Sequence, residues 1–189
     1  WTNGWLPARY RGTEFSSSGT PVLNLKSALP VSATEQRNNL DFLNRLNRIH
    51  QRRLPGEDEL EARIQNYELA ARMQLAASDV LDLKQESKET RALYGLDNPV
   101  TAAYGSRVLM ARRLVEAGVR FVQVFPPASP SSQPWDNHNN LPRDLPNICR
   151  QTDQPSAALV KDLKRRGLLD EVMVMWTGEF GRLPISEAK

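Results

Sequence analysis

The sequence predicts an α/β fold organised around two buried parallel strands. Residues 119–125 and 172–176 are short apolar runs with β-branched and aromatic side chains, which is typical of strands covered on both faces. A Pro-rich loop and a segment of helical periodicity lie between them. Strand, loop, helix and strand form a βαβ unit, and the right-handed crossover rule makes its strands parallel. Both strands should therefore end at the same sheet edge, where open α/β sheets bind ligands.

The first part of the chain predicts a loop followed by a helical hairpin. Residues 1–31 mix Gly, Ser and Pro with scattered apolar side chains, as in an irregular segment anchored by aromatic residues. Ser32 and Glu35 have the spacing of a capping box, and apolar residues recur at helical intervals as far as Leu54. A second helical pattern begins at Leu60. We assign residues 32–95 to a helical insertion within one incomplete domain spanning residues 1–189.

Two longer helices are predicted on either side of the first strand. A connector at residues 78–99 should hold a short helix before Gly95, and Asp97-Asn98-Pro99 signals a longer helix that Gly118 ends. The buried face of that helix is expected to comprise Val100, Ala103, Tyr104, Val108, Ala111, Leu114 and Val115. The next helix should run to Gly167 with Leu159 and Leu163 buried. Either Thr152 or Asp153 caps this helix, or Pro155 kinks it.

Composition and charge narrow the range of partners. The net charge of +3 and the pI near 9.2 permit an anionic partner. We interpret the basic clusters at residues 52–53, 112–113 and 164–166 as solvated helix ends, and no aromatic residues interleave with them as a nucleic-acid surface would need. No apolar run approaches the ~18 residues of a membrane span. Cys149, the single cysteine, excludes an intramolecular disulfide and is expected to be a small, partly buried side chain.

The predicted sheet edge gathers the residues of a candidate metal site. Glycines in residues 178–181 allow a sharp turn that places Glu179 and Arg182 at the end of one strand. Asp136 and His138 occupy the loop after the other strand. Such oxygen and nitrogen ligands suit Zn²⁺, Mn²⁺ or a related divalent ion, and Arg182 offers a planar fork to a tetrahedral oxyanion. The alternative is a strand-ending turn with solvated charges, in which the Asp and Asn residues only form turns.

Five stretches of the sequence share the pattern of one known family: residues 112–124, 135–140, 152–155, 162–169 and 178–182. They closely resemble the domain of unknown function fifteen-hundred-and-one, a family that looks like a branch of the alkaline phosphatase and sulfatase superfamily. The resemblance covers nearly the whole chain. It implies an αβα sandwich of the alkaline phosphatase-like type and descent from metal-assisted hydrolases.

The resemblance also implies roles for individual residues. Asp136 and His138 correspond to ligands of a divalent metal (Zn, Mn, Mg or Ca), and Glu179 lies where many superfamily members carry an Asp-His-Gly ligand motif. Phe180 departs from that motif because it cannot ligate, which puts a full two-metal site in doubt. We assign Arg182 and Asn137 to binding of the substrate.

The chain begins at Trp1 and ends at Lys189, and we interpret it as an internal piece of a longer protein. The superfamily's nucleophile and its last histidine motif would belong to the missing N- and C-terminal parts, so the piece alone should be inactive. Its unpaired sheet edges should also make it poorly behaved in isolation. Family resemblance implies export to the periplasm or the extracellular space.

Two functions follow from these observations. The first is metal-dependent hydrolysis of phosphate or sulfate esters, with an anionic small-molecule ester as substrate. The alternative is a catalytically silent member that keeps the fold as a binding or structural module. An upstream hydroxyl or thiol after a strand, with a downstream Asp-His pair, would favour the enzyme.

Overall fold

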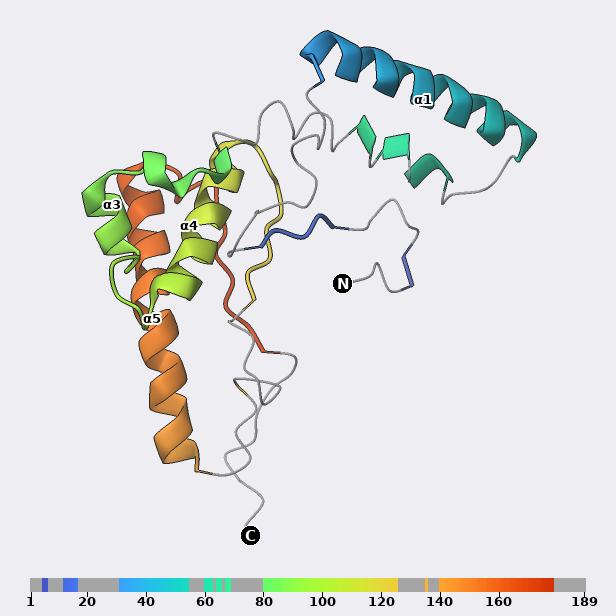
Figure 1. Cartoon of the computed structure of the whole chain (residues 1–189). Coiled ribbons are helices and arrows are strands. Elements are labelled where there is room, and N and C mark those ends of the chain that lie inside the picture. Colours follow the sequence, from blue (N-terminus) through green and yellow to red (C-terminus); the bar gives the residue numbers. More distant parts are fainter. Residues whose placement is uncertain are drawn as a thin grey trace.

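The computed structural model describes residues 5–6, 12–16, 31–54, 60–62, 64–65, 67–68, 80–125, 135 and 140–178. The elements named in it are α1 (Ala33–Arg53), the 3-10 helix η2 (Leu83–Gln85), α3 (Lys88–Leu93), α4 (Ala102–Glu116) and α5 (Leu141–Arg165). Helices α3, α4 and α5 pack together, whereas α1 lies apart from them (Figure 1). The short helix expected before Gly95 is α3, so that prediction is confirmed.

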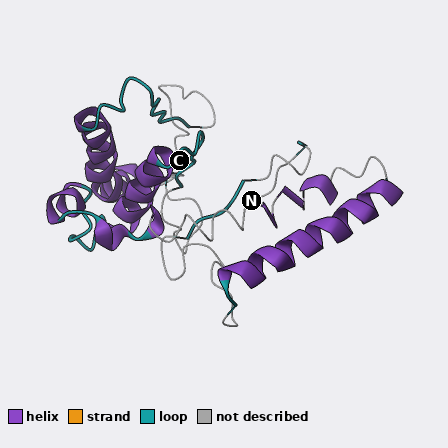
Figure 2. Ribbon diagram, turned by 90° about the horizontal axis from the view of Figure 1, so that it is seen from above, coloured by secondary structure: helices purple, strands orange, loops and turns teal. Residues whose placement is uncertain are grey.

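The predicted α/β sandwich is wrong for the described part of the chain, which contains helices and loops but no strand (Figure 2). Residues 119–125 and 172–178 are loops. Val122 and Val124 pack against clusters centred on α4, so a helix provides the burial that we had assigned to a sheet. Met173 and Met175 are 85% and 74% exposed, whereas a strand covered on both faces would bury them. Apolar content thus predicts the packing of Val122 and Val124 without revealing which element they pack against, and its prediction of burial is wrong for Met173 and Met175.

Helix α1 begins at the predicted capping box. The Ser32 hydroxyl accepts a hydrogen bond from the Glu35 amide at 3.2 Å, and the Ser32 amide donates to the Glu35 carboxylate at 2.9 Å. Glu35 and Ser32 thus satisfy two amides that the first turn would otherwise leave unpaired. The basic residues Arg52 and Arg53 are exposed in the last turn, as expected for a solvated helix end.

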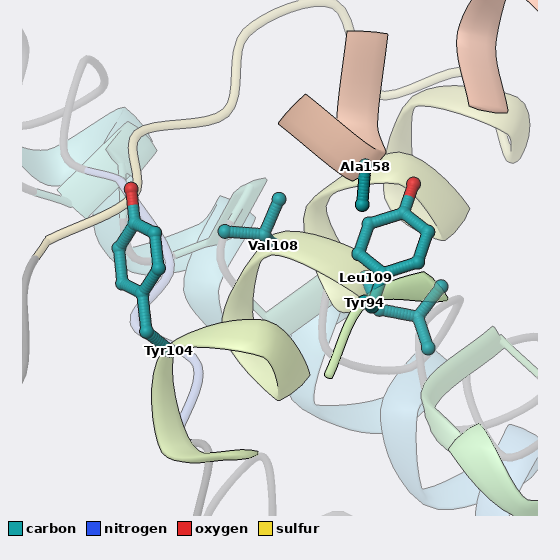
Figure 3. Packing of buried hydrophobic residues seen from close by; sticks show 5 residues of the cluster. All are labelled: Tyr94, Tyr104, Val108, Leu109 and Ala158. Carbon is teal, nitrogen blue, oxygen red and sulfur yellow. The ribbon is translucent and has the colours of Figure 1, made fainter. Parts of the chain in front are cut away.

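Helices α4 and α5 form the main contact between elements and enclose the core. Tyr94 and Leu109 are fully buried, and Ala158 is 1% exposed. Figure 3 shows the Tyr94 ring beside Leu109 and Ala158. On the predicted apolar face of α4, the residues found buried are Tyr104, Val108, Ala111 and Leu114.

The predicted burial is wrong for the first two residues of that face. Val100 is 50% exposed and Ala103 is also exposed, because α4 begins at Ala102 after a series of turns. Those turns are closed by the buried hydroxyl of Thr101, which donates to the Gly95 carbonyl at 2.6 Å. Gly95 has φ +70, the left-handed conformation that favours glycine.

Helix α5 contains two internal prolines, Pro146 and Pro155, so of the two predicted alternatives the one that places Pro155 within the helix holds. Thr152 lies inside it and donates its hydroxyl to the Ile148 carbonyl at 3.1 Å, so neither Thr152 nor Asp153 is the N-terminal cap. Leu163 is 1% exposed, as predicted. Gly118 and Gly167, with φ +92 and +71, follow the ends of α4 and α5 as expected for C-terminal caps.

Candidate functional site

The five predicted site residues lie outside the described part of the structure: Asp136, Asn137, His138, Glu179 and Arg182. Two tryptophans next to them are described. Trp135 directly precedes Asp136, and Trp176 precedes Glu179 by three residues. Each tryptophan is therefore a described residue close in sequence to one half of the predicted site.

Trp135 and Trp176 contact each other edge to face. Their ring centroids are 5.8 Å apart and their planes are perpendicular, which is a favourable arrangement for two aromatic rings. Trp135 is half-buried, whereas Trp176 is 63% exposed. The contact joins segments that are 41 positions apart in the sequence. It therefore brings together two described residues that lie close in sequence to the two halves of the predicted site.

A network of charged side chains around the buried Arg112 is the second feature that could carry function. It joins the loop after η2 to α4 and α5, and its members are Glu86, Arg112, Arg113, Glu116, Asp162 and Arg166. Three carboxylates balance three guanidinium groups, so the network is electrically neutral.

Arg112 lies at the centre of this network with only 1% of its side chain exposed. Its Nη2 is 2.7 Å from Oε1 of Glu86, and its Nε is 3.2 Å from Oδ2 of Asp162. These two nitrogens meet the carboxylates as ion pairs without hydrogen-bond geometry. Nη1 donates to Glu116, one helical turn further along α4. Burial of an arginine is tolerated only when acids compensate its charge, as they do here.

Arg166 and Tyr94 donate hydrogen bonds to the carboxylate of Asp162. Arg166 Nε donates to Oδ1 of Asp162 at 3.0 Å, and its Nη1 donates to Glu116 at 2.8 Å. The Tyr94 hydroxyl donates to Oδ2 of Asp162 at 3.1 Å. Burial, followed by the charge of Asp162, raises the pKa of Tyr94, so its phenol remains a neutral donor. The network thereby links α3, α4 and α5.

The sequence interpretation of residues 112–113 as a solvated helix end is wrong for Arg112. A signal for its burial was present, because Arg112 follows Tyr104 and Val108 at intervals of four on the apolar face of α4. Asp162 likewise follows Pro155 and Ala158 on the buried side of α5. Because its guanidinium groups are paired with carboxylates, the network serves packing better than it would serve binding of an anionic substrate.

Acid should weaken the structure through Glu86. Burial acts to raise the pKa of Glu86, but the hydrogen bond from Arg113 and the positive charge of Arg112 outweigh it and leave the pKa below its ordinary value of 4.5. A carboxylate with a lowered folded-state pKa contributes stability that is present above its unfolded-state pKa and is lost as pH falls through the folded-state value. We expect the free energy of unfolding to decrease below pH 4.5.

The measurement for this prediction is urea unfolding at a series of acid pH values. Glu86→Gln should be less stable than the unmodified protein at neutral pH and should show a shallower decrease in acid. Glu171→Gln, at an exposed position, is the control and should retain the full decrease. Identical acid slopes for the Glu86→Gln variant and the unmodified protein would contradict the assignment.

The described residues contain neither a cluster of metal ligands nor a membrane-spanning helix. No group of three or more His, Cys, Asp or Glu side chains there is placed to hold a metal ion. No helix in that part of the chain has the length and apolar character needed to cross a membrane. Cys149 is a free, partly buried thiol, as the sequence predicted.

The described residues define a mainly helical protein with a buried ionic network and two converging segments that carry polar motifs. The chain belongs to the family described as "Protein of unknown function (DUF1501)", whose family profile matches residues 1–189. Neither the curated proteins nor the solved structures include a significant match. The match confirms the resemblance to this family alone and assigns no activity.

Proposed function

We propose that the chain provides the metal-binding part of a hydrolase for phosphate or sulfate esters. Asp136, His138 and Glu179 would hold a divalent ion, while Arg182 and Asn137 would bind the anionic group of a small-molecule ester. The observation that supports this proposal most directly is the contact between Trp135 and Trp176.

Chain connectivity explains why that contact matters. Asp136 is bonded to Trp135, and the three residues from Trp176 to Glu179 span at most about 11 Å even when fully extended. Connectivity thus limits how far apart the two motifs can begin, which supports the proposal of a shared site. The contact between the two tryptophans, instead of a shared sheet edge, is therefore the observation that relates the two motifs.

The donor set fits one divalent ion. Two carboxylates and an imidazole are ligands that Zn²⁺ and Mn²⁺ accept, and the carboxylates also suit Mg²⁺ or Ca²⁺. Phe180 supplies no ligand, so the set fits a single ion better than a pair. When bound, such an ion polarises an ester oxygen and stabilises developing negative charge.

The remaining residues would bind and orient the ester. Arg182 can hold two oxygens of a phosphate or sulfate group through its planar fork, and the amide of Asn137 can donate to a third. The described arginines Arg112, Arg113 and Arg166 are already paired with carboxylates. We assign binding of the substrate anion to Arg182 because it lies three residues after the proposed ligand Glu179.

Metal analysis of the purified protein tests this function. The unmodified protein should retain a divalent ion after dialysis, whereas Asp136→Ala and His138→Ala should each lose most of it. Asp153→Ala removes an exposed carboxylate from α5 and should leave the metal content unchanged. Equal metal content with and without the Asp136 and His138 side chains would contradict the proposed metal site.

Activity separates the hydrolase from the silent alternative. Intact full-length protein, including the parts expected to supply the nucleophile, should hydrolyse an aryl phosphate or an aryl sulfate if it binds the metal through these side chains, and Arg182→Ala should raise KM for that ester. Metal binding without turnover of either ester would favour the catalytically silent member of the family.

A further inference from the structure

Helix α1 carries an apolar stripe that its described neighbours leave exposed. Phe42, Leu46 and Ile49 are 60%, 46% and 48% exposed, and Leu43 beside them is 41% exposed. Spacings of four and three residues place Phe42, Leu46 and Ile49 on one side of the helix. The stripe therefore forms a continuous apolar strip rather than scattered exposed residues.

The opposite side of α1 makes the described contacts of the helical hairpin. Asn44 donates to the Glu68 carboxylate, and Gln51 Nε2 donates to Oε2 of Glu61 at 2.6 Å. Asn44 and Gln51 lie about half a turn around the helix from Phe42. Glu61 and Glu68 thus contact α1 on its polar face, and the stripe is directed away from these two residues.

Arginine side chains lie next to the stripe on the surface of α1. Helix α1 contains five arginines and two acidic residues, which gives it a net charge of +3. Arg45 precedes Ile49 by four residues, while Arg52 and Arg53 follow it by three and four, so all three are its neighbours on the helix surface. Among the described residues, none forms an ion pair with these three arginines.

We propose that α1 binds the surface of an anionic lipid membrane, with its axis parallel to that surface and its apolar stripe inserted. An apolar stripe bordered by arginines is the arrangement found in helices that lie in the membrane interface. The arginines complement the negative headgroups, and their long side chains reach the headgroup layer while the stripe enters the apolar layer.

Charge argues against a second copy of the chain as the occupant. Pairing two α1 helices along their stripes would bring together two surfaces that each carry a net charge of +3. An anionic membrane surface would instead attract the arginines of α1. The inference does not depend on the proposed metal site, because α1 contains none of its residues.

Vesicle sedimentation with the purified protein tests this inference. The protein should bind vesicles of phosphatidylcholine and phosphatidylglycerol roughly a hundredfold more tightly than vesicles of phosphatidylcholine alone, and added salt should weaken the binding. The triple variant Arg45→Gln, Arg52→Gln, Arg53→Gln should lose this preference. The variant Phe42→Ser, Leu46→Gln should bind both kinds of vesicle weakly.

Matched controls come from exposed positions on α5. Arg150→Gln, Lys161→Gln and Arg165→Gln together remove the same charge, and Val160→Gln removes an exposed apolar side chain; neither variant should change vesicle binding. Circular dichroism of each variant checks that its helices remain. Equal binding to both vesicle types would overturn the inference. Two other results would also overturn the inference if Leu46→Gln abolishes them. One is a dimer that forms as the protein concentration rises, and the other is binding of an acidic helical peptide by protein that does not bind vesicles.

Discussion

Replacing Arg112 with alanine should lower the free energy of unfolding by about 3–5 kcal/mol, the range expected when one partner of a buried ionic group is removed. Glu86 and Asp162 would then remain in a buried setting without the guanidinium that compensates their charge. Urea unfolding followed by circular dichroism measures the change. Arg165→Ala, which removes an exposed arginine from α5, should change the free energy of unfolding by less than about 0.5 kcal/mol.

Arg112→Lys separates charge from geometry. A lysine keeps the positive charge but presents a point charge instead of a planar fork, so it cannot face Glu86, Glu116 and Asp162 together. We expect its stability to lie between that of the unmodified protein and that of Arg112→Ala. If Arg112→Ala were no more damaging than Arg165→Ala, the network would not be a main support of the fold.

Replacing Gly105 with alanine should destabilise the protein by roughly 1–3 kcal/mol, as overpacking does in a core. Alanine is the better helix former at most helical positions, by about 1 kcal/mol. At Gly105, however, an added Cβ would lie 2.2 Å from the Tyr94 carbonyl oxygen, which is backbone and cannot rotate away. The clash should outweigh the gain in helix propensity.

Thermal unfolding of Gly105→Ala and Ala103→Gly tests whether the preference for alanine over glycine is reversed at position 105. Ala103 is exposed on the same helix, so its change to glycine should lower stability through propensity alone. Alanine should therefore be favoured over glycine at position 103 and disfavoured at position 105. A higher melting temperature for Gly105→Ala would show that the turn at Tyr94 moves away at little cost.

The start of α1 and the ends of α4 and α5 could be predicted from the sequence because their signals are local. The capping box at Ser32 depends on residues within one turn, and the glycines at 118 and 167 follow from the left-handed conformation that ends a helix. The fold class could not be predicted in this way. The apolar residues Val122 and Val124 indicated burial, but the sequence did not reveal that they pack on a helix-centred core instead of within a sheet.

The ionic network was missed for a related reason. A cation near the end of a helix is usually solvated, and this general tendency hid the position of Arg112 on the apolar face of α4. Its acidic partners Glu86 and Asp162 are distant in the sequence, so their convergence depends on tertiary packing. By contrast, the candidate metal site was predicted from motif chemistry. The contact of Trp135 with Trp176 adds a reason to treat its two motifs as one site.

The central functional claim is that the motifs following these two tryptophans share one metal ion, and a double-mutant cycle of metal affinity tests it most directly. Isothermal titration with Mn²⁺ would compare Asp136→Ala, Glu179→Ala and the double variant. Each single change should weaken binding by more than the roughly 10–100-fold that loss of an outer-shell partner costs. The double variant should be little worse than either single variant, because the shared site is already lost. Metal affinity that is unaffected by Glu179→Ala, or losses that add independently, would contradict a single shared site.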